Sequence, residues 1–237
     1  VPANLRGPNN EWVGIAKRSR VIYYNPLNVT EAEMAGLTYE DLSDSKWKGR
    51  IAIRSSGNMY NQSLISSLIA NHGEATIEAW AKDFVGNFAR KPEGNDRAQI
   101  MAVANGEADI AIANSYYIGL MLSGKKGEEQ QSAARKVQLH FPGQEGRGAH
   151  INVSGAGLMK NAPNKSNAVK FIEFLLGEEA QSHIVNNTYE YPMLEGVAPS
   201  DLINQFGTGF KEDQTPVASY GEFNPTAVKL MDRVGWQ

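Results

Sequence analysis

The chain has 237 residues, of which 41% are hydrophobic and 21% charged, with a formal net charge of -3 and no cysteine. This length and balance are typical of a folded protein with one large or two modest domains. The composition excludes thiolate metal sites, disulfide bonds and thiol nucleophiles. The scattered charges argue against nucleic acid as a partner, and no apolar run is long enough for a transmembrane helix.

The first quarter of the chain predicts short strands and one helix. The segments WVGI (12–15) and VIYY (21–24) indicate two strands on either side of a polar turn, AKRSR. Residues Thr30 to Leu42 predict a helix, with a cap at Thr30 and its partner Glu33 three residues later. Residues 47–55 predict a basic turn followed by a strand.

The middle of the chain alternates helices with one buried strand. Apolar residues recur at helical spacing in three successive segments, and ADIAIAN has the pattern of a buried strand. The predicted elements are helices over 62–71, 74–90 and 96–105, a strand over 108–114, and a helix from Tyr116 to Gly124.

The last third continues the alternation. The predicted elements are a polar loop or helix over 125–136, strands over 137–141 and 150–158, a helix from Asn164 to Asn186, an irregular segment over 187–199 and a final helix from about Pro225 to Val234. Strands that alternate with helices along a whole chain predict the α/β class.

Motifs of common enzymes are absent from the sequence. It contains no GxSxG, HExxH or GxxxxGK[ST] segment, and GAGLMK (155–160) lacks the third glycine of a dinucleotide fingerprint. The four histidines are far apart. The best available nucleophile is Ser154 with a distant histidine, which is a weak basis for an enzyme.

Two adjacent tyrosine pairs have different settings. Tyr23 and Tyr24 lie in a predicted strand, where neighbours point to opposite faces and do not converge on one atom. Tyr116 and Tyr117 lie where a strand gives way to a helix, so their phenol oxygens can meet at its first turn. Ligands bind at such carboxyl ends of strands in α/β folds. From the residues alone, core packing and binding of a hard cation both remain open for this second pair.

Tyr60 occupies the same kind of position. It follows the strand-and-turn segment RIAIRSSGN and opens a predicted helix. Packing and metal binding remain open for this side chain as well.

Several segments together resemble the ferric-iron-binding periplasmic proteins of bacterial ABC importers. They are RSRVIYYNP, DLSDSKWKGRIAIRSS, NGEADIAIANSYYIG, HINVSGAG, APNKSNAVKFIEFLLGEEAQ and TYEYP. The similarity covers nearly the whole chain in the same order. It implies a two-lobed α/β fold of the type II periplasmic-binding-protein kind, also described as a transferrin-like lobe.

The resemblance also implies a set of site residues. The two adjacent tyrosines that bind Fe(III) in that family match Tyr116 and Tyr117, and a further tyrosine of an anion-independent subgroup matches Tyr60. Asn58, Asn95 and Asn114 fall where relatives place polar groups around an anion, and Arg97 lies near the same place, where it would neutralise phenolate charge.

Family members usually begin some 80 residues earlier, and those residues supply further ligands and much of the first lobe. The resemblance therefore implies an incomplete first lobe here. We expect residues 1–21 and 148–199 in the first lobe, and residues 22–147 and 200–237 in the second lobe, which carries the tyrosines. Apolar surface in the first lobe should then be exposed or paired with another chain.

The function implied by the resemblance is capture of ferric iron in the periplasm and its delivery to a permease in the inner membrane, with no enzymatic reaction. The alternatives are the same fold with a different small solute or an oxyanion, an α/β enzyme, and the sensor domain of a regulator.

Overall fold

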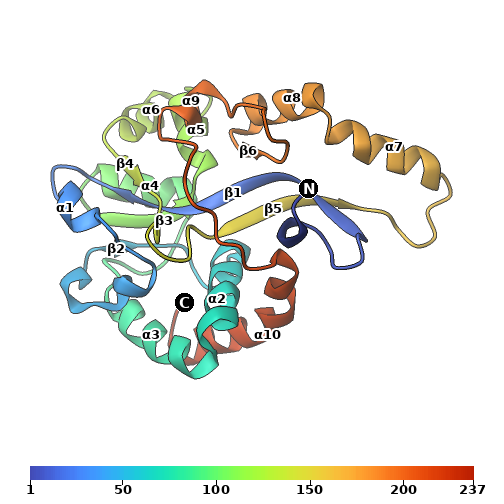
Figure 1. Cartoon of the computed structure of the whole chain (residues 1–237). Coiled ribbons are helices and arrows are strands. Elements are labelled where there is room, and N and C mark those ends of the chain that lie inside the picture. Colours follow the sequence, from blue (N-terminus) through green and yellow to red (C-terminus); the bar gives the residue numbers. More distant parts are fainter.

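The computed structural model describes residues 1–237, and its central feature is one long strand, β1, from Trp12 to Tyr24 (Figure 1). The predicted turn AKRSR is therefore wrong. Charged residues can continue a buried strand when each meets an opposite charge. Three of them do so: Lys17 pairs with Glu212, Arg18 with Glu190, and Arg20 with Asp96.

Strand β1 is shared by two ends of a six-stranded mixed sheet. Its Trp12–Ser19 portion pairs antiparallel with β5 (Ile151–Gly157) and β6 (Tyr191–Pro192), which together form the β5 end. Its Arg20–Tyr24 portion pairs antiparallel with β3 (Ile110–Asn114) and β4 (Gln138–His140), and β2 (Ile51–Ala52) runs parallel to β3; these form the β3 end. The predicted α/β class is confirmed.

Ten α-helices and three short 3-10 helices complete the structure. The α-helices are α1 (Glu31–Met34), α2 (Met59–His72), α3 (Glu74–Gly86), α4 (Asp96–Ala104), α5 (Tyr116–Leu122), α6 (Glu128–Ala134), α7 (Lys165–Leu175), α8 (Glu178–Thr188), α9 (Asp201–Asn204) and α10 (Val217–Arg233). The 3-10 helices are η1 (Ala3–Leu5), η2 (Glu40–Ser43) and η3 (Ser45–Trp47).

Two apolar clusters occupy the two faces of the β3 end. Helices α2, α3 and α10 cover one face, and α4, α5, α6 and α9 cover the other (Figure 1). Tyr24 packs in the first cluster and Tyr23 in the second. The prediction that these neighbours point to opposite faces is confirmed.

Two predicted helices differ from the observed ones. The capping box of Thr30 and Glu33 is present, but α1 ends at Met34, and Gly36 then adopts a φ of 70° that stops the helix. The long helix predicted from Asn164 is two helices, because the backbone of Gly177 is extended between α7 and α8.

Helix α7 contributes no buried residue. Its side chains Val169, Phe171 and Phe174 are exposed, as we expected for apolar surface in this part of the chain. None of the helices combines the length and the apolar character needed to cross a membrane.

Candidate metal centre

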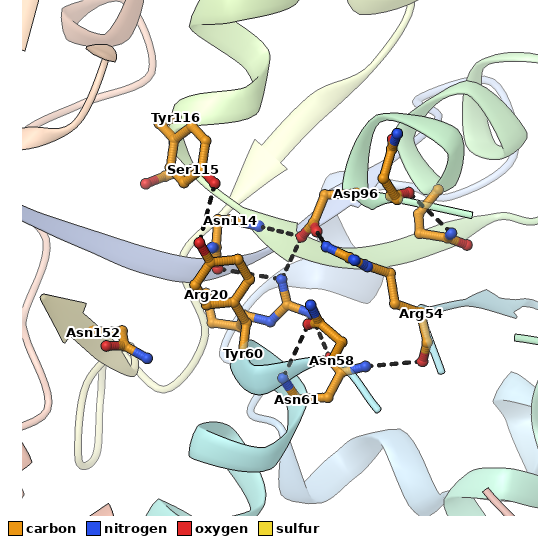
Figure 2. A network of polar contacts seen from close by, with 12 residues as sticks. Arg20, Arg54, Asn58, Tyr60, Asn61, Asp96, Asn114, Ser115, Tyr116 and Asn152 are labelled. Atoms are coloured by element: carbon orange, nitrogen blue, oxygen red, sulfur yellow. Dashed lines mark hydrogen bonds and ion pairs between the residues drawn. The ribbon is translucent and has the colours of Figure 1, made fainter. Parts of the chain in front are cut away.

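Tyr60 enters the site from the first turn of α2. The helix starts there because the Asn58 side chain accepts a hydrogen bond from the backbone N–H of Asn61 at 3.3 Å, which satisfies one of the free donors of the first turn. The Tyr60 hydroxyl then lies 3.5 Å from the hydroxyl of Tyr116, and the two phenols point toward one another in Figure 2.

Tyr116 and Tyr117 are the first two residues of α5, directly after β3 and Ser115. Their rings are stacked, with centroids 4.2 Å apart and an angle of 29° between the ring planes. All three tyrosines are half-buried. Three phenol groups from two helix N-termini therefore gather beside the carboxyl end of β3, where α/β folds place ligands.

A buried charge network lies next to the phenols (Figure 2). The Arg20 guanidinium donates to Asp96 Oδ1 at 2.5 Å and to Asn114 Oδ1 at 3.2 Å, and it also pairs with the Asn61 side chain. Arg54 donates to the other oxygen of Asp96 at 2.7 Å. Two guanidinium groups and one carboxylate leave one excess positive charge beside the tyrosines.

The pKa values in the site follow from burial and these charges. Burial raises the pKa of Tyr116, and the neighbouring hydroxyls of Tyr117 and Tyr60 raise it further. Burial also raises the pKa of Tyr117, which Asp96 raises further and Arg54 partly lowers. Burial acts to raise the pKa of Asp96 as well, but Arg20 and Arg54 outweigh it and hold that pKa below its usual range. The phenols are thus protonated unless a cation replaces their protons.

The four polar residues expected around the tyrosines have different surroundings. Asn58 and Asn95 cap α2 and α4, and each accepts a backbone hydrogen bond. Asn114 lies in the charge network, and its amide nitrogen is buried without a hydrogen-bond partner. Arg97 donates to Gln130 of α6 at 3.0 Å. The charge of Arg54 acts to lower the pKa of Tyr117.

The sequence interpretation missed the charged part of the site, namely Arg18, Arg20, Arg54, Asn61 and Asp96. Arg18 and Arg20 are two residues apart, which places both on one face of a strand. This period of two was the available signal, and the prediction of a turn concealed it.

The donor set favours a hard cation held by oxygen. The structure contains no cluster of three or more histidine or acidic side chains that would hold a metal ion. Phenolate oxygens carry the charge that a small trivalent cation such as Fe(III) needs from its ligands. The three tyrosines can supply three such oxygens.

In this α/β fold, β1 runs through both ends of the sheet, and the polar site lies beside it. This is the fold of a type II periplasmic solute-binding protein. The sequence profile described as bacterial extracellular solute-binding protein matches residues 1–206, and the chain belongs to this family.

Individual relatives are iron proteins. Iron uptake protein A1 of Synechocystis sp. is 51% identical over all of this chain. A structure from Trichodesmium, described as FutA (IdiA) in complex with iron and citrate, is 54% identical with a TM-score of 0.96 and is matched over 74% of its length. The ferric binding protein of Campylobacter jejuni is 40% identical with a TM-score of 0.91, again over 74% of its length.

The chain spans about two thirds of the curated relatives it matches, 65% of Iron uptake protein A1 and 68% of Iron uptake protein A2.

Proposed function

We propose that this chain binds Fe(III) through the phenolates of Tyr60, Tyr116 and Tyr117 and serves a bacterial ABC importer as its solute-binding protein. The observation that carries the proposal is the convergence of these phenols, with the Tyr60 and Tyr116 hydroxyls 3.5 Å apart. Relatives named as iron uptake and ferric binding proteins support the choice of ferric iron.

Charge balance explains why three tyrosines suit a trivalent cation. Three phenolates neutralise the 3+ charge of the ion, so that the bound ion itself adds no net charge to the closed site. The excess positive charge of Arg20, Arg54 and Asp96 would balance a further anionic ligand. Reduction to Fe(II), which suits phenolates less well, or protonation of the phenolates would release the ion.

Delivery to a permease in the inner membrane and a periplasmic location complete the proposal. We further propose that residues 1–21 and 148–199 belong to one lobe and residues 22–147 and 200–237 to the other. The boundary between residues 21 and 22 falls close to the point on β1 where its partners change from β5 to β3. Bending there would open and close the cleft around the ion.

A catalytic role has little support in the arrangement of side chains. Ser154 accepts a hydrogen bond from Arg18 at 2.6 Å rather than facing a histidine. Ser63 does face His150 at 3.2 Å, but both are buried, and the other ring nitrogen of His150 has no partner to orient it. A binding protein that makes and breaks no substrate bond is the function we propose.

A second candidate, an oxyanion bound in the same place, is favoured by one observation. The side-chain nitrogen Nδ2 of Asn114 and Nε of Arg20 are buried donors without partners. Buried donors of this kind are satisfied when an anion accepts from them. A ligand titration separates the two: an oxyanion alone gives no visible colour, whereas phenolate-bound Fe(III) absorbs visible light.

The test is a titration of the protein with ferric citrate, followed by visible absorption. Tyr116→Phe and Tyr117→Phe each remove one phenol oxygen and retain the ring. Each should weaken ferric binding more than about tenfold, or about 1.4 kcal/mol, and fade or shift the band. Tyr60→Phe should act in the same direction.

Tyr24→Phe is the control, because Tyr24 pairs with Ile110, at the opposite end of β3 from Asn114 and the tyrosine site, and should leave binding intact. Unaltered ferric binding by the Tyr116→Phe, Tyr117→Phe double variant would end the proposal.

A further inference from the structure

Arg18 lies on β1 and is fixed to the β5 end of the sheet. Its guanidinium donates to Ser154 Oγ at 2.6 Å and to the carbonyl oxygen of Val153 at 3.2 Å, both on β5. It also pairs with the carboxylate of Glu190, which precedes β6. The residue is only 7% exposed. Three groups bind the guanidinium, so its position is well defined.

The same guanidinium reaches a residue of the β3 end. Arg18 Cζ lies 5.5 Å from the centroid of the Tyr60 ring, within the range of a cation–π contact. Tyr60 belongs to α2, which packs on α10 and covers the β3 end. Arg20 lies two residues further along the same strand, and its Cζ atom is 5.9 Å from the centroid of the Tyr60 ring. The Tyr60 ring is therefore covered by two guanidinium groups, one held at each end of the sheet.

We propose that Arg18 is a positioning residue for Tyr60, and that the contact couples the orientation of this phenol to the relative position of the two ends of the sheet. The inference rests on the proposed ferric site. The Tyr60 oxygen has to point at the ion; its hydroxyl meets that of Tyr116, and Arg18 contacts the ring. Glu190 and Ser154 in turn hold Arg18.

The chemistry of this position requires arginine. A planar guanidinium can donate along its edge to Ser154, Val153 and Glu190 while its face lies on a ring, whereas a lysine ammonium has no face to stack. Lys17, the preceding residue, shows the contrast. It points to the other side of the strand, and its ammonium makes a single ion pair with Glu212 at 2.7 Å.

Coupling between two ends of a sheet is reciprocal. If the contact between Arg18 and Tyr60 favours the arrangement that binds the ion, the bound ion favours that contact to the same extent. Loss of Arg18 should then weaken ferric binding and speed release of the ion, although Arg18 contributes no ligand oxygen.

The experiment is a double-variant cycle on the full chain, with Arg18→Met and Tyr60→Phe alone and together. Ferric affinity is measured by competition with citrate, and the visible band is recorded for each protein. Arg18→Met alone should weaken binding about tenfold and shift the band. In the Tyr60→Phe background, where no phenol oxygen remains to be oriented, Arg18→Met should change the affinity less than about twofold.

Three further variants complete the set. Arg18→Lys keeps the charge but not the planar face and should recover only part of the affinity. Glu190→Gln keeps the shape of the side chain that holds Arg18 but removes its charge. If Arg18→Met does not fold, Glu190→Gln takes its place in the cycle. Lys17→Met removes a neighbouring cation from the opposite side of β1 and should leave affinity and band unchanged.

The outcomes separate this inference from the proposed function. Equal losses caused by Arg18→Met in both backgrounds, or no loss in either, overturn the inference while the tyrosine site stands. Absence of a ferric band in the unaltered protein overturns both.

Discussion

Asp96 is the residue on which the charge network depends. It has no exposed surface, and its two oxygens pair with Arg20 and Arg54. Because these cations hold the pKa of Asp96 below its usual range, the carboxylate contributes stability above the unfolded pKa of about 4. That contribution is lost as the pH falls through the lower folded pKa. Burial of the pair is costly by itself, so the balance rests on both partners being present.

We predict that Asp96→Asn lowers the free energy of unfolding by about 3–5 kcal/mol, because Arg20 is then buried without a counter-charge. Asp109→Asn is the matched control. It breaks the ion pair between Asp109 and Arg50, in which each of the two side chains is 24% exposed. Loss of this pair should cost less than about 1 kcal/mol. Urea unfolding measures both. Similar losses in the two variants would show that burial does not set the strength of the Asp96 network.

Among the elements, α5 packs closely against the residue that follows α8. A Cβ atom at Gly119 would lie 2.8 Å from Cβ and 2.9 Å from Cγ of Tyr189. Tyr189 ends α8 with a left-handed φ of 63°, an uncommon conformation for a bulky residue. Helix α5, which carries Tyr116 and Tyr117 at its start, is thus fixed against the C-terminal end of α8 through one glycine.

We predict opposite results for two glycine-to-alanine changes within helices. Gly119→Ala should destabilise the protein by about 1–3 kcal/mol, because the added methyl overpacks the contact with Tyr189. Gly221→Ala in α10 has no atom within 4 Å of the new methyl and should stabilise by about 0.5–1 kcal/mol, the usual helix preference for alanine. Thermal unfolding compares them. A stabilising Gly119→Ala would show that α5 can move away from α8.

Elements whose apolar periodicity matched their burial were predictable from the sequence. The helices α2, α3 and α4 and the strand β3 lie within a few residues of their predicted bounds. Strand β1 was not predictable as one strand, because its polar residues suggest a turn and their partners are far away in the chain. Arg20, for example, pairs with Asp96, 76 positions later. The three tyrosines could be singled out from their places after strands, whereas the partners of Arg18 and Arg54 become visible only once the fold brings these arginines to Tyr60 and Asp96.

For the molecule as a whole, His150 joins segments that are distant in the chain. It precedes β5, faces Ser63 of α2 at 3.2 Å, and has its ring 4.9 Å from that of Tyr220 in α10. Its backbone N–H donates to the hydroxyl of Tyr39 at 3.0 Å. Burial, followed by the charges of Arg20 and Arg147, lowers the pKa of His150 to about 3. The folded protein therefore keeps this ring neutral where an unfolded chain would protonate it.

The stability of the protein should consequently depend on pH in part through His150. The unfolded chain binds a proton at His150 below about pH 6.5, and the folded protein does not do so until about pH 3. Stability from the neutral ring is complete above the unfolded pKa and is lost as the pH falls, at up to about 1.4 kcal/mol per pH unit. His150→Gln removes this titration. The free energy of unfolding that this variant lacks relative to the unaltered protein should therefore shrink by about 2 kcal/mol between pH 6.5 and pH 5.

Carboxylates titrate in both proteins, so their contribution cancels in the difference between the two free energies of unfolding. Urea unfolding at several pH values measures that difference. A pH-independent deficit for His150→Gln would mean that the histidine is protonated alike in the folded and unfolded states, and that its packing alone joins α2, α10 and β5.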